Sequence, residues 1–131
     1  MYAIELQTTF CAAHALHLLN GETEPLHGHN FNVTVRLTCQ RLDALQTVID
    51  FHDVERLLNQ VLAPWDNQNL NLLDPFRARI NPSAERIAEQ IGTQLQSAIN
   101  DLPESPATTR GLRVSEVRLT EAPGCLAIWR V

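Results

Sequence analysis

HGHNFNVTVRLTC, residues 27–39, carries the clearest structural pattern in the sequence. Its last ten residues alternate between two sets: apolar Phe31, Val33, Val35, Leu37 and Cys39, and polar Asn30, Asn32, Thr34, Arg36 and Thr38. Successive side chains of a strand point to opposite faces, and a sheet with one solvated face shows this alternation. The pattern therefore predicts a half-buried antiparallel strand over 29–39, opened by the two histidines.

A second strand is predicted upstream, over residues 2–10. Tyr2, Ile4, Leu6, Thr8 and Phe10 share one parity there. Residues 12–26, between the two strands, predict a loop because they carry Asn20-Gly21 and Pro25. The two strands are expected to be hairpin neighbours.

Two helices are predicted downstream. The first begins at an Asp50 N-cap, ends at Pro64 and has one apolar stripe of Val54, Leu57, Leu58, Val61 and Leu62. The second begins near residues 81–83, where either Asn81 or Ser83 can be the cap; its apolar face is Ala84, Ile87, Ala88, Ile91, Leu95 and Ala98. Residues 65–80 predict a long irregular connection, of a kind that is often functional. Residues 101–111 predict a polar loop, and two strands over 112–121 and 125–131 close the chain.

This order, β-β-α-α-β-β, predicts an α+β fold for a single domain spanning residues 1–131. We expect an antiparallel sheet with two helices on one face. Such a sheet leaves two edge strands exposed, and exposed edges favour pairing between subunits. A homo-oligomer is therefore expected.

Composition and charge exclude several classes of partner. The formal net charge of the 131 residues is −5, whereas nucleic-acid binding needs a basic face. No apolar stretch approaches the roughly 20 residues that span a bilayer, so no membrane partner is expected. The three cysteines, Cys11, Cys39 and Cys125, are scattered and form no CxxC pair. Their odd number and spacing favour a reducing, cytoplasmic location.

Three histidines form a candidate metal site. His27 and His29 lie two apart in an extended segment and therefore point to one side, with Gly28 between them allowing close approach. The hairpin can return His14 to the same end of the sheet. Three neutral imidazoles suit Zn²⁺ with an open fourth position, where a water is acidified or a substrate oxygen polarised. The alternative is that His27 and His29 form a solvated polar turn.

The other two histidines are expected to play lesser roles. His52 lies at the start of a helix and is expected to face solvent. His17 lies in the loop and is either a solvated side chain or a substrate contact.

Six motifs in chain order resemble the 6-pyruvoyl-tetrahydropterin synthase family, which includes the bacterial 6-carboxytetrahydropterin synthases. They are FCAAH (10–14), LHGHNF (26–31), VIDF (48–51), NLN (69–71), NPSAE (81–85) and TE (120–121). The resemblance implies the tunnelling fold, in which strands of three subunits form a continuous barrel and two trimers stack into a hexamer. It also implies active sites at subunit interfaces and a small pterin as substrate.

By this resemblance His14, His27 and His29 are the zinc ligands. Glu121 resembles the carboxylate that anchors the pterin, with Thr120 and Ser83 as further substrate-binding residues. A carboxylate suits the role because a 2-amino-4-oxo pyrimidine presents two adjacent N–H donors, which it accepts as a fork. Without the resemblance, Glu121 reads as a surface charge at a strand end.

The chain departs from the family pattern at two catalytic positions. Thr23 stands where the family has a cysteine four residues before the first histidine of HGH. Asp66-Asn67 stands where the family has an Asp-His pair, so that Asp66 is retained and the histidine is not. Glu24 resembles the glutamate that replaces the cysteine in a variant branch, which cleaves dihydroneopterin to 6-hydroxymethyl-dihydropterin. A carboxylate there can act as general base; the alternative is a solvated loop residue like Glu22.

The leading hypothesis is therefore a zinc-dependent lyase acting on the side chain of 7,8-dihydroneopterin or its triphosphate, with Glu24 and Asp66 as catalytic residues. A non-catalytic pterin- or purine-like ligand binder is the alternative, motivated by Thr23 and Asn67. An oligomeric scaffold with a vestigial metal is a third hypothesis. The resemblance leaves the pathway open among folate, queuosine (deazapurine) and biopterin synthesis.

Overall fold

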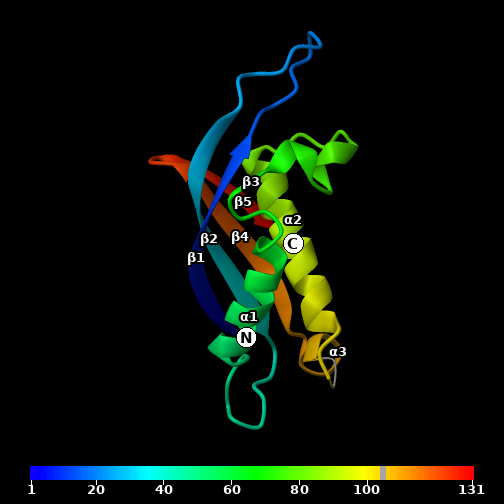
Figure 1. The fold of residues 1–131 in the computed structure, drawn as a ribbon. Coiled ribbons are helices and arrows are strands. Elements are labelled where there is room, and N and C mark those ends of the chain that lie inside the picture. The colour runs from blue at the N-terminus through cyan, green and yellow to red at the C-terminus, as the bar shows by residue number, and fades with distance from the viewer. Residues whose placement is uncertain (104–105) are drawn as a thin grey trace.

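A long antiparallel hairpin of β1 (Tyr2–His14) and β2 (His27–Cys39) forms the middle of the sheet in the computed structural model (Figure 1). The structure describes residues 1–103 and 106–131. β1 continues four residues past the predicted end at Phe10, because it pairs with the HGH segment as far as His14 opposite His27. Only residues 15–26 form the connecting loop.

Three shorter strands complete the sheet, in the order β3-β1-β2-β4-β5. β4 (Arg113–Ala122) and β5 (Cys125–Arg130) continue it antiparallel on the β2 side. β3 (Gln68–Asn69) was not predicted and runs parallel to β1, so the sheet is not wholly antiparallel. The connection reaches β1 because the Asn67 N–H donates to the Cys11 carbonyl at 2.6 Å.

The two predicted helices are confirmed. α1 (Phe51–Leu62) has Asp50 as its N-cap, with the carboxylate accepting from the His52 N–H. α2 (Ala84–Asn100) is capped by Ser83, whose hydroxyl accepts from the Arg86 N–H at 3.2 Å, which decides between the two candidate caps. In the part of the chain that the structure describes, the remaining helices are short: two 3₁₀ turns, η1 (Leu70–Leu72) and η2 (Phe76–Ala78), and α3 (Pro106–Arg110) within the predicted polar loop.

The helices cover one face of the sheet, as predicted, and the apolar side chains of the hairpin form the core beneath them (Figure 1). Phe10 and Phe31 are paired across β1 and β2, and their rings stack with centroids 5.1 Å apart. Gly92 of α2 lies directly against the Trp129 ring on β5. The three histidines continue the core face of this hairpin toward the end that carries the connecting loop, so the fold places them beneath the start of α2.

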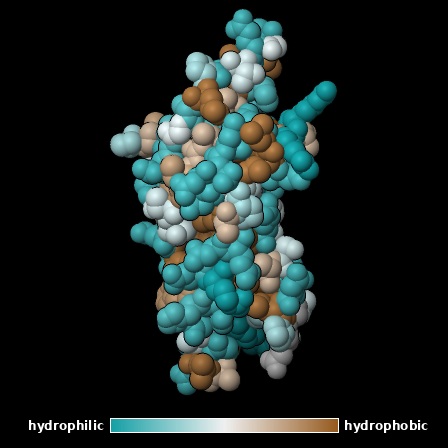
Figure 2. All heavy atoms as spheres, viewed as in Figure 1, coloured by the Kyte–Doolittle hydropathy of each residue, from teal (hydrophilic) through white to brown (hydrophobic). Residues whose placement is uncertain are grey.

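The surface is mainly hydrophilic in the view of Figure 2, with separate hydrophobic patches. Leu18, Leu19 and Leu26 are exposed on the loop between β1 and β2, which projects from one end of the molecule (Figure 1). The opposite face of the sheet is polar; there the Thr9 hydroxyl donates to Asn32 Oδ1 at 2.9 Å. None of the described helices is long and apolar enough to cross a membrane.

Candidate metal centre

The register of the hairpin brings the three predicted ligands together. His14 pairs with His27, and His29 pairs with Ala12 two residues away, so all three imidazoles project from the same face. One ring nitrogen from each lies within 4.8 Å of those of the other two. The ring centroids are 4.7 to 5.2 Å apart, and the rings meet edge to face. The sequence therefore identified a real cluster rather than a solvated turn.

Backbone carbonyls fix the orientation of two of the rings. His14 Nδ1 lies 2.6 Å from the Pro82 carbonyl, and His27 Nδ1 lies 2.8 Å from the Pro25 carbonyl. A carbonyl only accepts, so in each ring Nδ1 carries a proton, and in the neutral imidazole Nε2 then keeps its lone pair. This carbonyl-to-Nδ1 arrangement is the one commonly found behind metal-ligating histidines.

Two of the Nε2 atoms are buried without a hydrogen-bond partner among the described residues, those of His14 and His29. Buried polar atoms of folded proteins are nearly always paired, so two buried nitrogens without a hydrogen bond inside this cluster indicate a site for a ligand. Three imidazoles without a thiolate suit Zn²⁺ with an open coordination position. The cluster therefore fits the metal that the sequence predicts.

Glu121 projects into the same cluster from a bulge in β4. Its Oε1 lies 3.0 Å from His14 Nε2 and 3.9 Å from His29 Nε2. The short contact with His14 is not a hydrogen bond, because its angles are unsuitable. Glu121 also lines a cavity of about 260 Å³, together with Ser83 and Glu85 at the start of α2. The carboxylate thus stands between the metal donors and a hollow that a small ligand can enter.

Glu24 reaches the cluster from the loop. Its Oε1 accepts from the Leu16 N–H at 2.9 Å and lies 4.0 Å from His27 Nε2. The neighbouring Thr23 hydroxyl lies 3.1 Å from His17 Nδ1 and so occupies that imidazole. Of the neighbouring residues Thr23 and Glu24, Glu24 is therefore the one directed toward the metal ligands.

Two predicted site residues are not brought to the cluster within one chain. Asp66 Oδ1 accepts from the Cys11 N–H at 3.0 Å, which places Asp66 along the edge of β1. Thr120 pairs with Asn32 and lines a hollow on the polar face of the sheet, opposite to the histidines. For Thr120 the reason is its pairing with Asn32, whose side chain lies on the polar face.

Sequence reasoning missed three residues near the site. Glu85 lines the cavity across from Glu121. Asn71 and Asn81 bind the backbone just after His14. All three lie inside motifs that the sequence singled out, but only the position of the loop relative to β1 shows what they contact.

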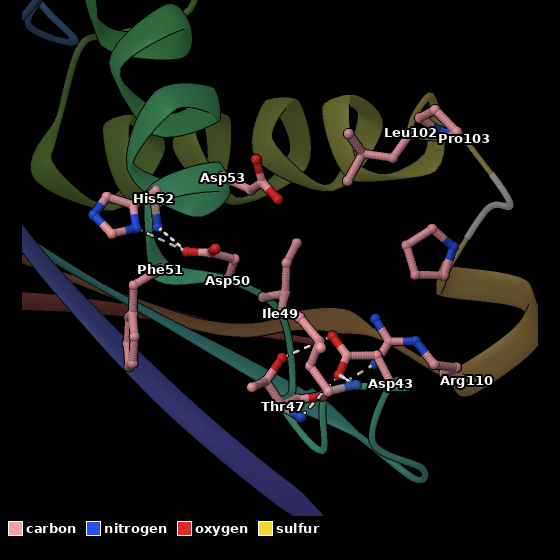
Figure 3. Close-up of a pocket in the computed structure, with 12 residues that line it drawn as sticks. Asp43, Thr47, Ile49, Asp50, Phe51, His52, Asp53, Leu102, Pro103 and Arg110 are labelled. Carbon is pink, nitrogen blue, oxygen red and sulfur yellow. Dashed lines mark hydrogen bonds and ion pairs between the residues drawn. The ribbon is translucent and has the colours of Figure 1, made fainter.

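A larger cavity, of about 620 Å³, is formed by residues at the other end of the molecule (Figure 3). Its carboxylates already serve the fold. A hydrogen bond from the Thr47 hydroxyl lowers the pKa of Asp43, and the His52 N–H lowers the pKa of the Asp50 cap. Arg110 donates to the Val48 carbonyl at 2.8 Å. Asp43, Asp50 and Arg110, three of the charged groups that line this cavity, therefore hold the loop before α1.

Comparisons with known proteins agree with the geometry. The family model of 6-pyruvoyl tetrahydropterin synthase matches residues 3–131. A protein of Archaeoglobus fulgidus, provisionally named 6-carboxy-5,6,7,8-tetrahydropterin synthase, is 31% identical over 120 residues, which are 90% of this chain and 86% of that protein. The chain therefore belongs to the 6-pyruvoyl tetrahydropterin synthase family.

Solved structures agree on the fold. The 6-pyruvoyl tetrahydropterin synthase of Caenorhabditis elegans has a TM-score of 0.78 at 20% identity, covering 99% of this chain and 95% of that one. The Plasmodium vivax enzyme has a TM-score of 0.73 at 24% identity, covering 100% and 99%. The expected tunnelling fold is confirmed.

Proposed function

We propose that the chain is a zinc-dependent lyase that cleaves the side chain of 7,8-dihydroneopterin or its triphosphate, leaving 6-hydroxymethyl-dihydropterin. The observation that carries the proposal is the convergence of three imidazole nitrogens with the Glu24 carboxylate 4.0 Å from one of them. Family membership supports a pterin as the substrate.

His14, His27 and His29 would hold the metal ion. Zn²⁺ bound by three imidazoles supplies a Lewis acid that polarises an oxygen of the substrate side chain. The chain's own contribution is preorganisation, because the Pro82 and Pro25 carbonyls hold two of the rings in the ligating tautomer before any metal enters.

Glu24 would act as the general base. Removal of the proton from the hydroxyl on the second side-chain carbon turns that carbon into a carbonyl and breaks its bond to the first carbon. The electron pair passes to the first carbon, which takes up a proton and stays on the ring as a hydroxymethyl group, while a two-carbon aldehyde departs. Glu24 is held for this role by the Leu16 N–H, which occupies only one of its oxygens.

A structure of a Plasmodium vivax 6-pyruvoyltetrahydropterin synthase supports a carboxylate in this role, because it is a variant in which a glutamate described as a catalytic residue is replaced by alanine. That protein shares the fold with a TM-score of 0.72 at 23% identity. In this chain Glu24 is the carboxylate that meets the cluster from the loop, whereas Thr23 is bonded to His17.

The pterin ring would occupy the cavity of about 260 Å³ beside the histidines, with Ser83 at its rim and Glu121 as the anchor for the two N–H donors. Glu85 is the alternative anchor. It is favoured by one observation, namely that Glu121 Oε1 already lies 3.0 Å from His14 Nε2 and so is placed to act at the metal.

Association of subunits would complete the site. β5 and most of β1 are free edges of the described sheet, and edge pairing of three chains would close a barrel. Asp66 lies on the β1 edge, away from the histidines of its own chain, so it would assist catalysis in a neighbouring subunit. Thr120, on the polar face, would contact substrate only by way of such an interface.

The test is an incubation of zinc-loaded protein with dihydroneopterin and with its triphosphate, with products identified by mass. The expected product is 6-hydroxymethyl-dihydropterin. Glu24→Gln keeps an oxygen for the Leu16 N–H but cannot accept the proton, so turnover should fall by roughly 10²- to 10⁴-fold. Glu22→Gln on the same loop is the matched control and should leave turnover unchanged. Full activity in Glu24→Gln would refute the general-base role of Glu24, and the absence of any pterin product would refute the proposed lyase activity.

The second candidate is a pterin- or purine-like ligand binder without turnover, favoured by Thr23 and Asn67 at the catalytic positions of the family. Asn67 has a structural reason to be there, because it adopts a left-handed backbone with φ of 59°, which asparagine tolerates. Calorimetric titration with pterins separates the candidates. Glu121-dependent binding with no product would favour the binder.

A further inference from the structure

The three residues after His14 lie beyond the end of β1, and side chains bind much of their backbone. Only His17 forms a bridge of its own, an isolated antiparallel one with Thr23. Asn71 Oδ1 accepts from the Ala15 N–H at 2.8 Å, and Asn71 Nδ2 donates to the Ala15 carbonyl at 2.7 Å. Asn81 makes the same pair of bonds to His17, at 2.7 and 3.0 Å. A carboxamide offers one donor and one acceptor side by side, so each asparagine replaces one residue of a missing neighbouring strand.

Glu24 binds the residue between these two clamped positions. Its Oε1 accepts from the Leu16 N–H at 2.9 Å, and its own N–H donates to the Leu16 carbonyl at 3.0 Å. The carboxylate proposed as general base therefore takes its position from Leu16. Leu16, in turn, takes its position from the two asparagine-bound residues on either side.

The second asparagine also belongs to the segment that orients a metal ligand. Asn81 precedes Pro82, whose carbonyl lies 2.6 Å from His14 Nδ1, and Ser83, which caps α2. Asn71 is itself fixed, because its N–H donates to Asn69 Oδ1 at 3.0 Å. Both asparagines thus link residues 65–83, which lead from α1 to α2, to the segment that follows His14.

We propose that Asn71 and Asn81 are positioning residues that set His14 and Glu24 relative to each other. The inference rests on the proposed function, since it concerns the same metal ligand and base. Without the clamps, residues 15–17 would exchange their bonds for water, and the Pro82 carbonyl and the Glu24 carboxylate would no longer be held at fixed distances from the His14 and His27 rings. Loss of partners beyond the ligands themselves typically weakens metal binding by about 10- to 100-fold.

The experiment titrates the metal-free chain with Zn²⁺ against a chromophoric chelator, and with Co²⁺, whose visible spectrum reports the coordination geometry. The variants are Asn71→Ala and Asn81→Ala, with Asn59→Ala on the exposed side of α1 as the matched control. Asn71→Asp and Asn81→Asp keep an acceptor for the backbone N–H but lose the donor to the carbonyl. They provide an intermediate perturbation if an alanine variant folds poorly. Amide exchange at Ala15 and His17 reports each clamp separately.

We expect about 10- to 100-fold weaker Zn²⁺ binding in each alanine variant, a changed Co²⁺ spectrum, and intermediate values in the aspartate variants. Asn59→Ala should match the wild type. Variants that bind both metals as the wild type does, with unchanged Co²⁺ spectra while the Ala15 or His17 amide exchanges faster, would overturn the positioning role and leave the proposed function intact. A wild-type chain that binds neither metal would overturn the proposed function as well.

Discussion

Replacement of Gly92 by alanine tests how α2 is seated on the sheet. A Cβ at Gly92 would meet the Trp129 ring at 2.1, 2.5 and 2.9 Å, whereas ordinary contact begins at 3.4 Å. The ring or the helix must therefore move by roughly 1.3 Å. Overpacking of this kind costs about 1–3 kcal/mol, while alanine in a helix gains about 1 kcal/mol over glycine. We expect Gly92→Ala to lower the free energy of unfolding by about 1 kcal/mol.

The assay is urea unfolding of the metal-free chain at one protein concentration, followed by far-UV circular dichroism. Trp129→Leu provides the control, because it removes the ring that the new methyl group would meet. In that background Gly92→Ala should stabilise by up to about 1 kcal/mol, as it does at an open helix position. A stabilising Gly92→Ala in both backgrounds would refute the close packing of α2 on β5.

Three further predictions concern the cavity, the first helix and the edge of the sheet. Glu121→Gln should weaken pterin binding by roughly 10- to 100-fold, since a charge-assisted hydrogen bond contributes about 1.5–3 kcal/mol; calorimetry that shows the loss in Glu85→Gln instead would move the anchor to Glu85. The His52 N–H lowers the pKa of Asp50 below its ordinary value of 3.8, so Asp50 contributes stability above that value and loses it as the pH falls through the lower, folded pKa. Asp50→Asn should therefore differ from the wild type in unfolding midpoint near neutral pH, and the difference should begin to shrink only as the pH falls below 3.8; a constant difference would contradict this. Asp66→Asn keeps an acceptor for the Cys11 N–H and should fold normally but lose turnover, whereas unchanged turnover would show that Asp66 only supports β1.

The alternation in residues 29–39 and the apolar stripes of the two helices were sufficient to predict the antiparallel part of the sheet and both main helices. Each of these elements buries one face, and the period of that face is visible in the sequence. The end of β1 could not be predicted, since Ala12, Ala13 and His14 form a strand only by pairing with HGH. β3 is similarly invisible, because two residues carry no period and their pairing depends on the bond from Asn67 to Cys11.

The candidate site was predictable where spacing alone determines direction. His27 and His29 had to share a face, and His14 followed from the hairpin. Thr120 and Asp66 were not predictable in the same way. The face that Thr120 presents depends on the register in which β4 pairs with β2, and the place of Asp66 depends on how a long connection meets the edge of β1.

Metal analysis of the purified protein tests the three-histidine site most directly. The convergent Nε2 atoms of His14, His27 and His29 predict one Zn²⁺ per chain after dialysis, and loss of that zinc in a folded variant that combines His27→Ala with His29→Ala. Zinc that stays at one per chain in this variant, or a folded wild type that retains none, would contradict the assignment.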